Sequence, residues 1–137
     1  MEMSRRVLNT LPSFQSSGPR IALVGEAPGE NEESQGKPFV GYSGQLLDQM
    51  CAKAGIIRAS CLVGNVFQYR PPGNKIELVD KTSPFWVESV EQLRTDLKSF
   101  QPNLIVAMGN TALECLCDKR GITNWRGSIL PSTFIPV

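Results

Sequence analysis

The sequence predicts a three-layer α/β/α domain with a short, mostly parallel central sheet. Three apolar runs have strand length, at residues 20–25, 61–66 and 103–108, and segments with helical spacing of apolar residues lie between and after them. Apolar runs without alternation suit strands buried on both faces, and alternation of strands with helices is typical of a parallel sheet covered by helices. The length of 137 residues fits one such domain.

The first half of the chain begins with a polar arm, residues 1–19, in which we expect one short helix at residues 5–8. The domain proper is predicted to cover residues 20–137. After the first strand, residues 26–44 are rich in Gly, Pro, Glu and Asn and show no periodicity, which predicts a long loop. Apolar residues at helical spacing then predict a helix over 45–54, with Gly55 as its stop.

In the second half, the strand at 61–66 is followed by an irregular loop that extends to about Ser83. Pro84 suits the first position of a helix that runs to Phe100 with one apolar face. After the third strand, Gly109, Asn110 and Thr111 open a helix that reaches about residue 119, and residues 121–131 are read as a loop with a short strand at 128–130.

Ligands of open parallel sheets bind outside the carboxyl ends of the strands. Both long loops leave the sheet at that edge, and the turn at 109–111 follows the third strand there. We therefore expect a site built from residues 26–44, 65–74 and 109–111.

Composition narrows the function. The net charge is only +1, so DNA contact would need a local basic patch. The sequence has no histidine, which removes the usual general base and the commonest metal ligand. The four cysteines at 51, 61, 115 and 117 are not spaced as C-x-x-C. They are interpreted as buried reduced thiols of a cytoplasmic protein, and no run is long enough to span a membrane.

The glycine-rich turn after the first strand would also suit a nucleotide-binding unit. However, neither G-x-G-x-x-G nor G-x-x-x-x-G-K-S/T occurs. A small-nucleotide-binding α/β protein therefore remains only a distant alternative.

Three stretches carry a resemblance: GEAPGE at 25–30 with QGKPFVG at 35–41 and GQLLD at 44–48; Asn65-Val66 with RPPGN at 70–74; and PNLIVAMGNTAL at 102–113. Together they resemble the motifs of the uracil-DNA glycosylase superfamily. The resemblance is greatest to the family-4 enzymes of bacteria and archaea and to the phage DNA-polymerase-related proteins similar to them. Such likeness implies a uracil-DNA glycosylase-like fold and DNA, single-stranded or duplex with a flipped base, as the partner.

The resemblance also implies roles for single residues. Phe39 matches the aromatic that stacks on the base, Asn65 matches the asparagine that reads uracil, and Gly25 and Ala27 belong to the backbone that meets the base. Glu26 matches the catalytic carboxylate beside the reacting sugar. Purely structural roles stay open as alternatives. Phe39 could pack on the core, Asn65 could cap a turn, and Glu26 could be a solvated surface charge.

Contacts to DNA phosphates are expected from basic side chains and from one helix start. The candidates are Lys37 and Arg70, together with the helix start at Gly109, Asn110 and Thr111. The oligomeric state is not predicted.

Two departures from the family pattern shape the functional hypotheses. Family-4 enzymes hold an iron–sulfur cluster on four cysteines, whereas Tyr69 and residues 82–85 stand at two of those places and the arm has no cysteine. We therefore predict no metal and no cofactor.

The second departure is that the superfamily's last motif, a His-Pro segment after a final strand, has no counterpart here. The chain ends at 134–137, about where that strand is expected. Losing one donor aimed at developing charge costs about 3–4 kcal/mol. The hypotheses are thus a glycosylase, slow and apparently truncated, or a catalytically weak or inactive nucleic-acid-binding module associated with phage DNA replication.

Overall fold

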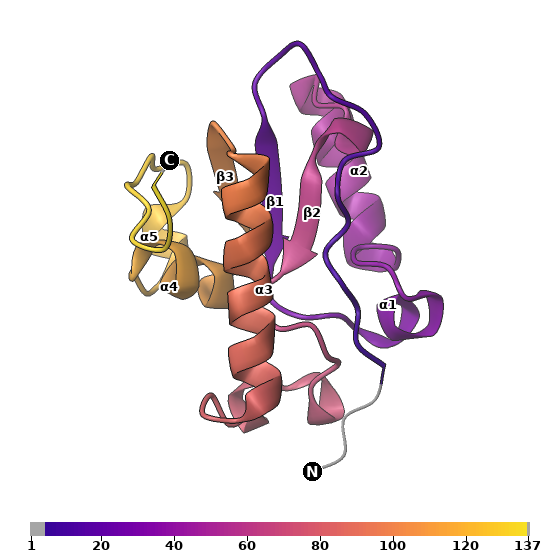
Figure 1. Cartoon of the computed structure of the whole chain (residues 1–137), viewed down its shortest axis with the longest axis vertical. Helices are drawn as coiled ribbons and strands as arrows, with labels where there is room; N and C mark the ends of the chain where they lie inside the picture. Colours follow the sequence, from indigo (N-terminus) through magenta and orange to yellow (C-terminus); the bar gives the residue numbers. More distant parts are fainter. Residues whose placement is uncertain (1–4, 137) are drawn as a thin grey trace.

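A computed structural model describes residues 5–136 of the chain (Figure 1). Its sheet has three parallel strands in the order β2-β1-β3, namely β1 (Ile21–Gly25), β2 (Leu62–Asn65) and β3 (Leu104–Ala107). Gly25, the last residue of β1, lies opposite Asn65, the last residue of β2. The three predicted strands and their parallel arrangement are confirmed.

Helices cover both faces of this sheet (Figure 1). Leu23 points to the face covered by α2 (Tyr42–Ala54), where it packs with Leu47 and Cys51. Its neighbours Ala22 and Val24 point the other way and pack against α3 (Pro84–Phe100) and α4 (Asn110–Cys117). Each strand residue therefore serves one of two cores, and the predicted three-layer α/β/α architecture is confirmed.

The predicted helix boundaries differ in accuracy. α3 begins and ends where expected, because Ser83 caps it by accepting a hydrogen bond from the Trp86 N–H at 3.3 Å and Pro84 fills its first turn. α2 begins at Tyr42 rather than Gln45, since Gly41 is its N-cap. α4 ends at Cys117 rather than near residue 119.

Three local predictions were wrong. Residues 26–44 are not a continuous loop, because α1 (Glu30–Gln35) lies within them. Residues 5–8 are not helical; the arm runs extended, and Thr10 pairs antiparallel with Val63 of β2. Residues 128–130 form no strand, and α5 (Ile122–Trp125) precedes them. Ile129 is 94% exposed, and the sheet that the structure describes within residues 5–136 contains only β1, β2 and β3.

The loop after β2 is shaped by short 3₁₀ turns at Pro72–Asn74 and Ile76–Leu78, and a third such turn, Arg58–Ser60, precedes the strand. Among the described residues, no helix is both long and apolar enough to cross a lipid bilayer.

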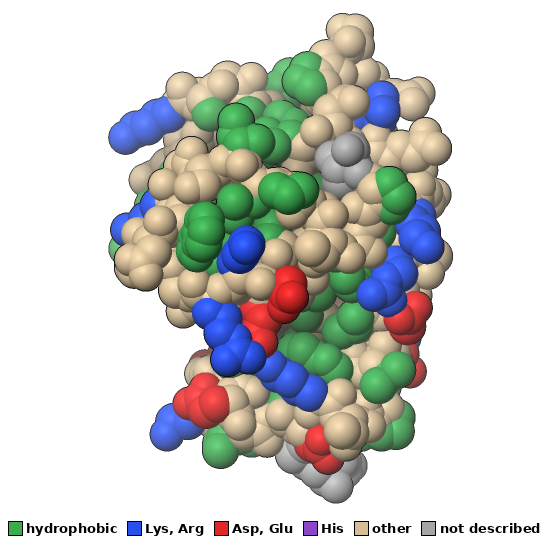
Figure 2. Space-filling view, turned by 90° about the vertical axis from the view of Figure 1, so that its left-hand side faces the viewer, with side chains coloured by type: hydrophobic (Ala, Val, Ile, Leu, Met, Phe, Trp, Pro, Cys, Tyr) green, Lys and Arg blue, Asp and Glu red, His purple; other side chains and the backbone are tan. Residues whose placement is uncertain are grey.

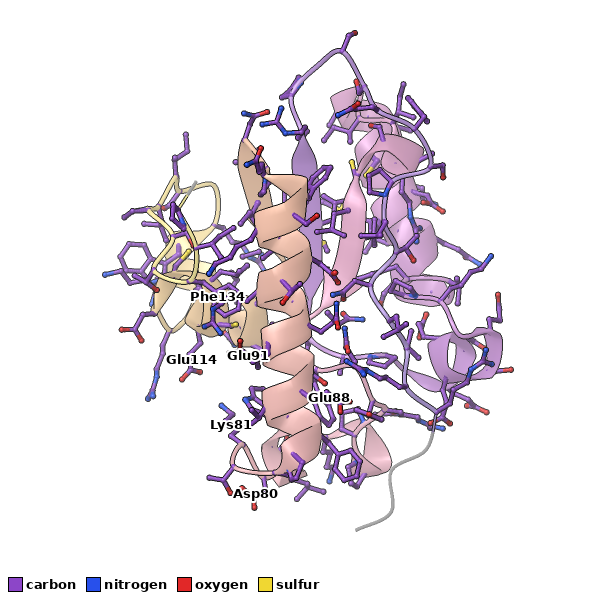
Figure 3. The ribbon with its side chains drawn as sticks, viewed as in Figure 1. Asp80, Lys81, Glu88, Glu91, Glu114 and Phe134 are labelled. Carbon is purple, nitrogen blue, oxygen red and sulfur yellow. The ribbon has the colours of Figure 1, made fainter. Side chains whose placement is uncertain are left out.

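The segment after α5 returns to the body of the domain. Phe134 lies beside α3 (Figure 3), and the Arg94 guanidinium sits over its ring at 4.2 Å from the centroid. The Thr133 N–H donates to the Leu116 carbonyl at 2.9 Å, and Ile135 is buried in the core under α3 and α4. Figure 2, which shows the side bearing α4 and α5, has basic and acidic side chains next to one another among hydrophobic ones.

Candidate functional site

A cavity of about 680 Å³ opens between α2 and the sheet, at the carboxyl ends of β1 and β2. Its polar lining comes from the segments predicted to form the site, and its apolar wall comes mostly from the sheet and α2, with Phe39 added from the first loop. The polar lining residues are Glu26, Glu32, Ser43, Asn65 and Asn74, and the larger apolar ones are Leu23, Phe39, Leu46, Leu47, Met50, Ile56, Val106 and Met108.

Glu26 stands at the point where β1 ends. One of its carboxylate oxygens, Oε2, accepts a hydrogen bond from the Thr111 hydroxyl at 2.7 Å. Thr111 belongs to the first turn of α4, which follows β3. The parallel sheet thus brings together two residues that are 85 positions apart in sequence and fixes the direction of the carboxylate.

Asn65 ends β2 and is 3% exposed. Its amide oxygen Oδ1 is buried and has no hydrogen-bond partner among the residues that the structure describes. A buried polar atom without a partner costs about 1–3 kcal/mol. This oxygen therefore offers a ready acceptor to any ligand in the cavity that carries an N–H group.

Phe39 and Asn65 approach each other over Gly25. A Cβ atom added to Gly25 would collide with Cζ of Phe39 and would lie 2.8 Å from Oδ1 of Asn65. Only glycine leaves room for both side chains here, so the aromatic ring and the amide form one continuous wall of the cavity.

The backbone around Phe39 is held from two sides. Its φ is +54°, in the left-handed region that non-glycine residues rarely adopt. Nη2 of Arg58 donates to the carbonyl oxygens of Pro38 and Phe39 at 3.1 and 2.9 Å. Gly44 packs on the carbonyl group of Phe39, and a Cβ atom at position 44 would collide with that carbonyl oxygen. These contacts maintain the unusual conformation that presents the ring.

Glu32 ties the two ends of the first loop together. Its carboxylate accepts hydrogen bonds from the backbone N–H groups of Gly29 at 3.0 Å, Val40 at 3.0 Å and Gly41 at 2.7 Å. Burial by itself would raise the pKa of Glu32, but the backbone N–H donors outweigh it and leave the pKa below its ordinary value. The carboxylate is thus a charged clamp that closes the loop carrying Phe39.

The structure brings together five of the predicted site residues, which all line the cavity: Gly25, Glu26, Ala27, Phe39 and Asn65. Thr111 joins them through its bond to Glu26. The other four candidates do not line it.

Those four candidates lie around the cavity or beyond it. Lys37 is exposed just after α1. Arg70 donates from Nε to Asn74 at 2.8 Å and lies 3.9 Å from the Glu33 carboxylate. Gly109 and Asn110 are exposed, and Asn110 accepts from the Ile122 N–H at 2.8 Å, which joins the start of α4 to α5.

Sequence reasoning missed several residues that shape the site. Glu32 and Arg58 hold the backbone around Phe39 through hydrogen bonds, and Leu46 and Met50 of α2 line the cavity. A signal for Glu32 existed, because a glutamate three residues after a glycine N-cap can fold back onto the cap N–H.

The cysteines do not fit the iron–sulfur cluster that the family-4 resemblance implies. Cys51, in α2, and Cys61 are buried on the face of the sheet that α2 covers, whereas Cys115 and Cys117 lie on the opposite face and are only half-buried, contrary to the prediction that all four thiols are buried. No group of three or more His, Cys, Asp or Glu side chains suited to a metal occurs within residues 5–136.

Aromatic residues stand at two of the places where family-4 enzymes have a cysteine ligand of the cluster, namely Tyr69 and, within residues 82–85, Phe85. Tyr69 and Phe85 meet edge to face at 5.2 Å, and Phe67 packs on Tyr69 and Trp86. The iron-free state remains a prediction.

Comparison with known proteins identifies the family of this chain. A profile of the uracil DNA glycosylase superfamily matches residues 12–134. The type-4 uracil-DNA glycosylase of Archaeoglobus fulgidus is 34% identical over 116 residues, which is 82% of this chain and 55% of that protein. The type-4 uracil-DNA glycosylase of Thermotoga maritima is 37% identical over 111 residues, 80% of this chain and 56% of that protein.

A DNA polymerase of Bacillus phage SP01 is 27% identical over 131 residues, which is 89% of this chain and 14% of the polymerase. The chain spans about half the length of the type-4 relatives it matches. Because the profile match covers most of the chain, this protein belongs to the uracil DNA glycosylase superfamily.

Proposed function

We propose that this chain is a uracil-DNA glycosylase domain that holds a uracil flipped out of DNA and hydrolyses its N-glycosidic bond, as a cytoplasmic step of base excision repair. One observation carries the proposal: a carboxylate, an aromatic ring and a buried, unpartnered amide oxygen line the same cavity. The four free cysteines agree with a reducing compartment.

Recognition of the base rests on Asn65 and Phe39. A uracil inside a duplex is out of reach, so the nucleotide has to leave the stack before it can enter the cavity. The N3–H of uracil would donate to the free side-chain oxygen Oδ1 of Asn65, and the side-chain N–H at Nδ2 of Asn65 would donate to O4 of uracil. The ring of Phe39 offers the apolar surface on which the base stacks. Cytosine presents an acceptor at N3 and a donor at N4, which opposes this amide orientation.

Hydrolysis rests on Glu26. When the C1′–N1 bond breaks, its electron pair leaves with the uracil, and positive charge develops on the sugar. A water molecule then adds its oxygen to C1′ and loses one proton, which passes through solvent to the departing uracil anion, so that the sugar gains a hydroxyl group and uracil leaves as the neutral base. The Glu26 carboxylate would stabilise the sugar cation and orient that water. The hydrogen bond from the Thr111 hydroxyl holds the carboxylate in one direction. Backbone N–H groups at Gly25 and Ala27 are the candidates for contacting the departing base.

Contact with DNA would come from the rim of the cavity. Arg70 lies beside Asn74, a lining residue, and Lys37 is exposed on the loop before Phe39. The start of α4, at Gly109 and Asn110, is open to a phosphate. Because few cations are involved and the net charge is +1, we expect modest affinity with a shallow salt dependence.

The test is an excision assay on single-stranded DNA with one deoxyuridine, in which abasic sites are revealed by alkaline cleavage. Binding of the same DNA is measured by fluorescence anisotropy. Wild type is expected to release uracil, and Glu26→Ala and Asn65→Ala are expected to lose at least about a hundredfold in rate, as for removal of one transition-state contact. Excision that survives in Asn65→Ala would refute the site.

A second function is favoured by the phage DNA polymerase match, which covers more of this chain than either type-4 match quoted above. In that case the chain is a catalytically weak or inactive DNA-binding module associated with phage replication. The same experiment separates the two: wild type and Asn65→Ala would then be equally inert and would bind DNA equally well. Binding of free nucleotides without binding of DNA would instead support a nucleotide-binding protein.

A further inference from the structure

Asn9, in the N-terminal arm, contacts the backbone of the proposed base-reading residue. The arm runs along the outer edge of β2, where Thr10 and Val63 exchange backbone hydrogen bonds of 2.7 and 3.0 Å. At the next outward-facing position of β2, the Asn65 N–H donates to the side-chain oxygen Oδ1 of Asn9 at 3.2 Å. A side chain therefore takes the place of the backbone acceptor that would continue the ladder.

Gly64 makes room for this contact. A Cβ at Gly64 would collide with Oδ1 and Cγ of Asn9. Any other residue at position 64 would push the asparagine out of its place. The need to accommodate the Asn9 side chain therefore explains why a glycine stands before Asn65 in β2.

The other end of the Asn9 amide is fixed by α3. Its Nδ2 donates to Oδ2 of Asp96 at 2.8 Å, and Gln92 donates to the other oxygen of Asp96 at 3.0 Å. Since Asp96 accepts only, Asn9 can present only its oxygen to the Asn65 N–H. A chain of three hydrogen bonds thus runs from Gln92 to the backbone of Asn65.

We propose that Asn9 is a positioning residue for base discrimination: it fixes the backbone at Asn65, and thereby the direction in which the Asn65 amide meets the base. This inference rests on the proposed function. Between uracil and cytosine the amide must hold one orientation, and a loosened backbone lets it tilt. Loss of Asn9 therefore lowers selectivity for uracil more than it lowers affinity for DNA.

The test uses the full chain and two oligonucleotides that carry one 2′-fluorinated deoxyuridine or deoxycytidine. The fluorine withdraws electrons from the sugar and slows cleavage, so equilibrium binding is measured. In Asn9→Ala we expect the ratio of the cytosine to the uracil Kd to fall about fivefold, the effect of one net hydrogen bond. Gly64→Ala, which displaces Asn9 without altering it, is expected to do the same.

A rescue pair separates positioning from general stability. Asn9→Asp alone faces Asp96 with a like charge and is expected to lose selectivity. Adding Asp96→Asn restores a donor toward the carboxylate introduced at position 9 and an acceptor toward Gln92, so the double variant is expected to regain it. Hydrogen exchange of the Asn65 backbone amide is measured in parallel and should speed up in each impaired variant and slow again in the rescued one.

The outcomes separate the two hypotheses. If Asn65→Ala leaves uracil binding unchanged, the proposed function fails and this inference fails with it. If Asn65→Ala abolishes selectivity while Asn9→Ala keeps both the selectivity and the slow exchange at Asn65, the inference about Asn9 alone is overturned. Equal selectivity in the single Asn9→Asp variant and the double variant also overturns it.

Discussion

The Glu32 clamp gives a quantitative test of how the first loop is held. In Glu32→Gln the side chain keeps its length but offers one oxygen in place of two and adds an N–H₂ donor. Three backbone N–H groups, those of Gly29, Val40 and Gly41, share the carboxylate. Whichever way the amide turns, at least one of them loses its acceptor and faces a donor.

The expected cost follows from these contacts. A hydrogen bond to a charged group contributes about 1.5–3 kcal/mol. Because Glu32 is only half-buried, water can satisfy part of the lost hydrogen bonding, and we expect the free energy of unfolding to fall by about 2 kcal/mol. For a domain of this size that lowers Tm by about 8 °C. The measurement is thermal unfolding followed by circular dichroism, with the exposed Glu30→Gln on the same helix as control.

The pH dependence of this difference tests its origin. The pKa of Glu32 in the folded chain is lowered below 4.5, its ordinary value, so the carboxylate stabilises the fold fully above that pH. As the pH falls through the folded pKa, the wild-type side chain is protonated and its advantage is lost. The Tm gap between wild type and Glu32→Gln should therefore close in acid. A gap that stays constant down to pH values well below the pKa, or an equal loss in Glu30→Gln, would refute the clamp.

Three further outcomes are expected. Gly25→Ala should weaken uracil binding by at least about tenfold, because its Cβ displaces Phe39, while Gly18→Ala, whose Cβ would meet its nearest atom at 3.5 Å, leaves binding unchanged; fluorescence anisotropy measures both. Phe67→Ala should lower the free energy of unfolding by about 3–5 kcal/mol in urea titrations, since the ring is fully buried, and a cost below about 1 kcal/mol would contradict its packing role. The purified protein should be colourless and free of iron by elemental analysis; stoichiometric iron would sink the prediction.

Local signals explain which elements could be predicted. α3 carries its start and its buried face within its own sequence, so its bounds follow from Ser83, Pro84 and the spacing of apolar residues. α1 has no buried residue, and its capping carboxylate also reaches forward to Gly41, so periodicity could not find it. The strand expected at 128–130 failed because an apolar pair is not enough when no partner strand lies beside it.

In the candidate site, too, some residues could be predicted from the sequence and others could not. Glu26 and Asn65 were expected at the same edge because Glu26 directly follows the first strand and Asn65 lies at the carboxyl end of the second, and the carboxyl ends of parallel strands meet at one edge of a sheet. The contributions of Arg58 and Asn9 depend on contacts across the fold, with Asn9 lying 56 positions from Asn65 in sequence. Such positioning residues belong to no sequence motif, because their contacts exist only in the folded chain.

The antiparallel arm has a practical consequence for handling the protein. Residues 7–10 cover one border of the sheet, with Val7 buried and its N–H bound to the Gln68 carbonyl at 2.7 Å. A shortened version that starts at Pro12 would bare the backbone groups of β2 at that border. Uncovered strand borders recruit other chains, so such a version should self-associate and precipitate. Removal of the N-terminal arm is therefore not a neutral change.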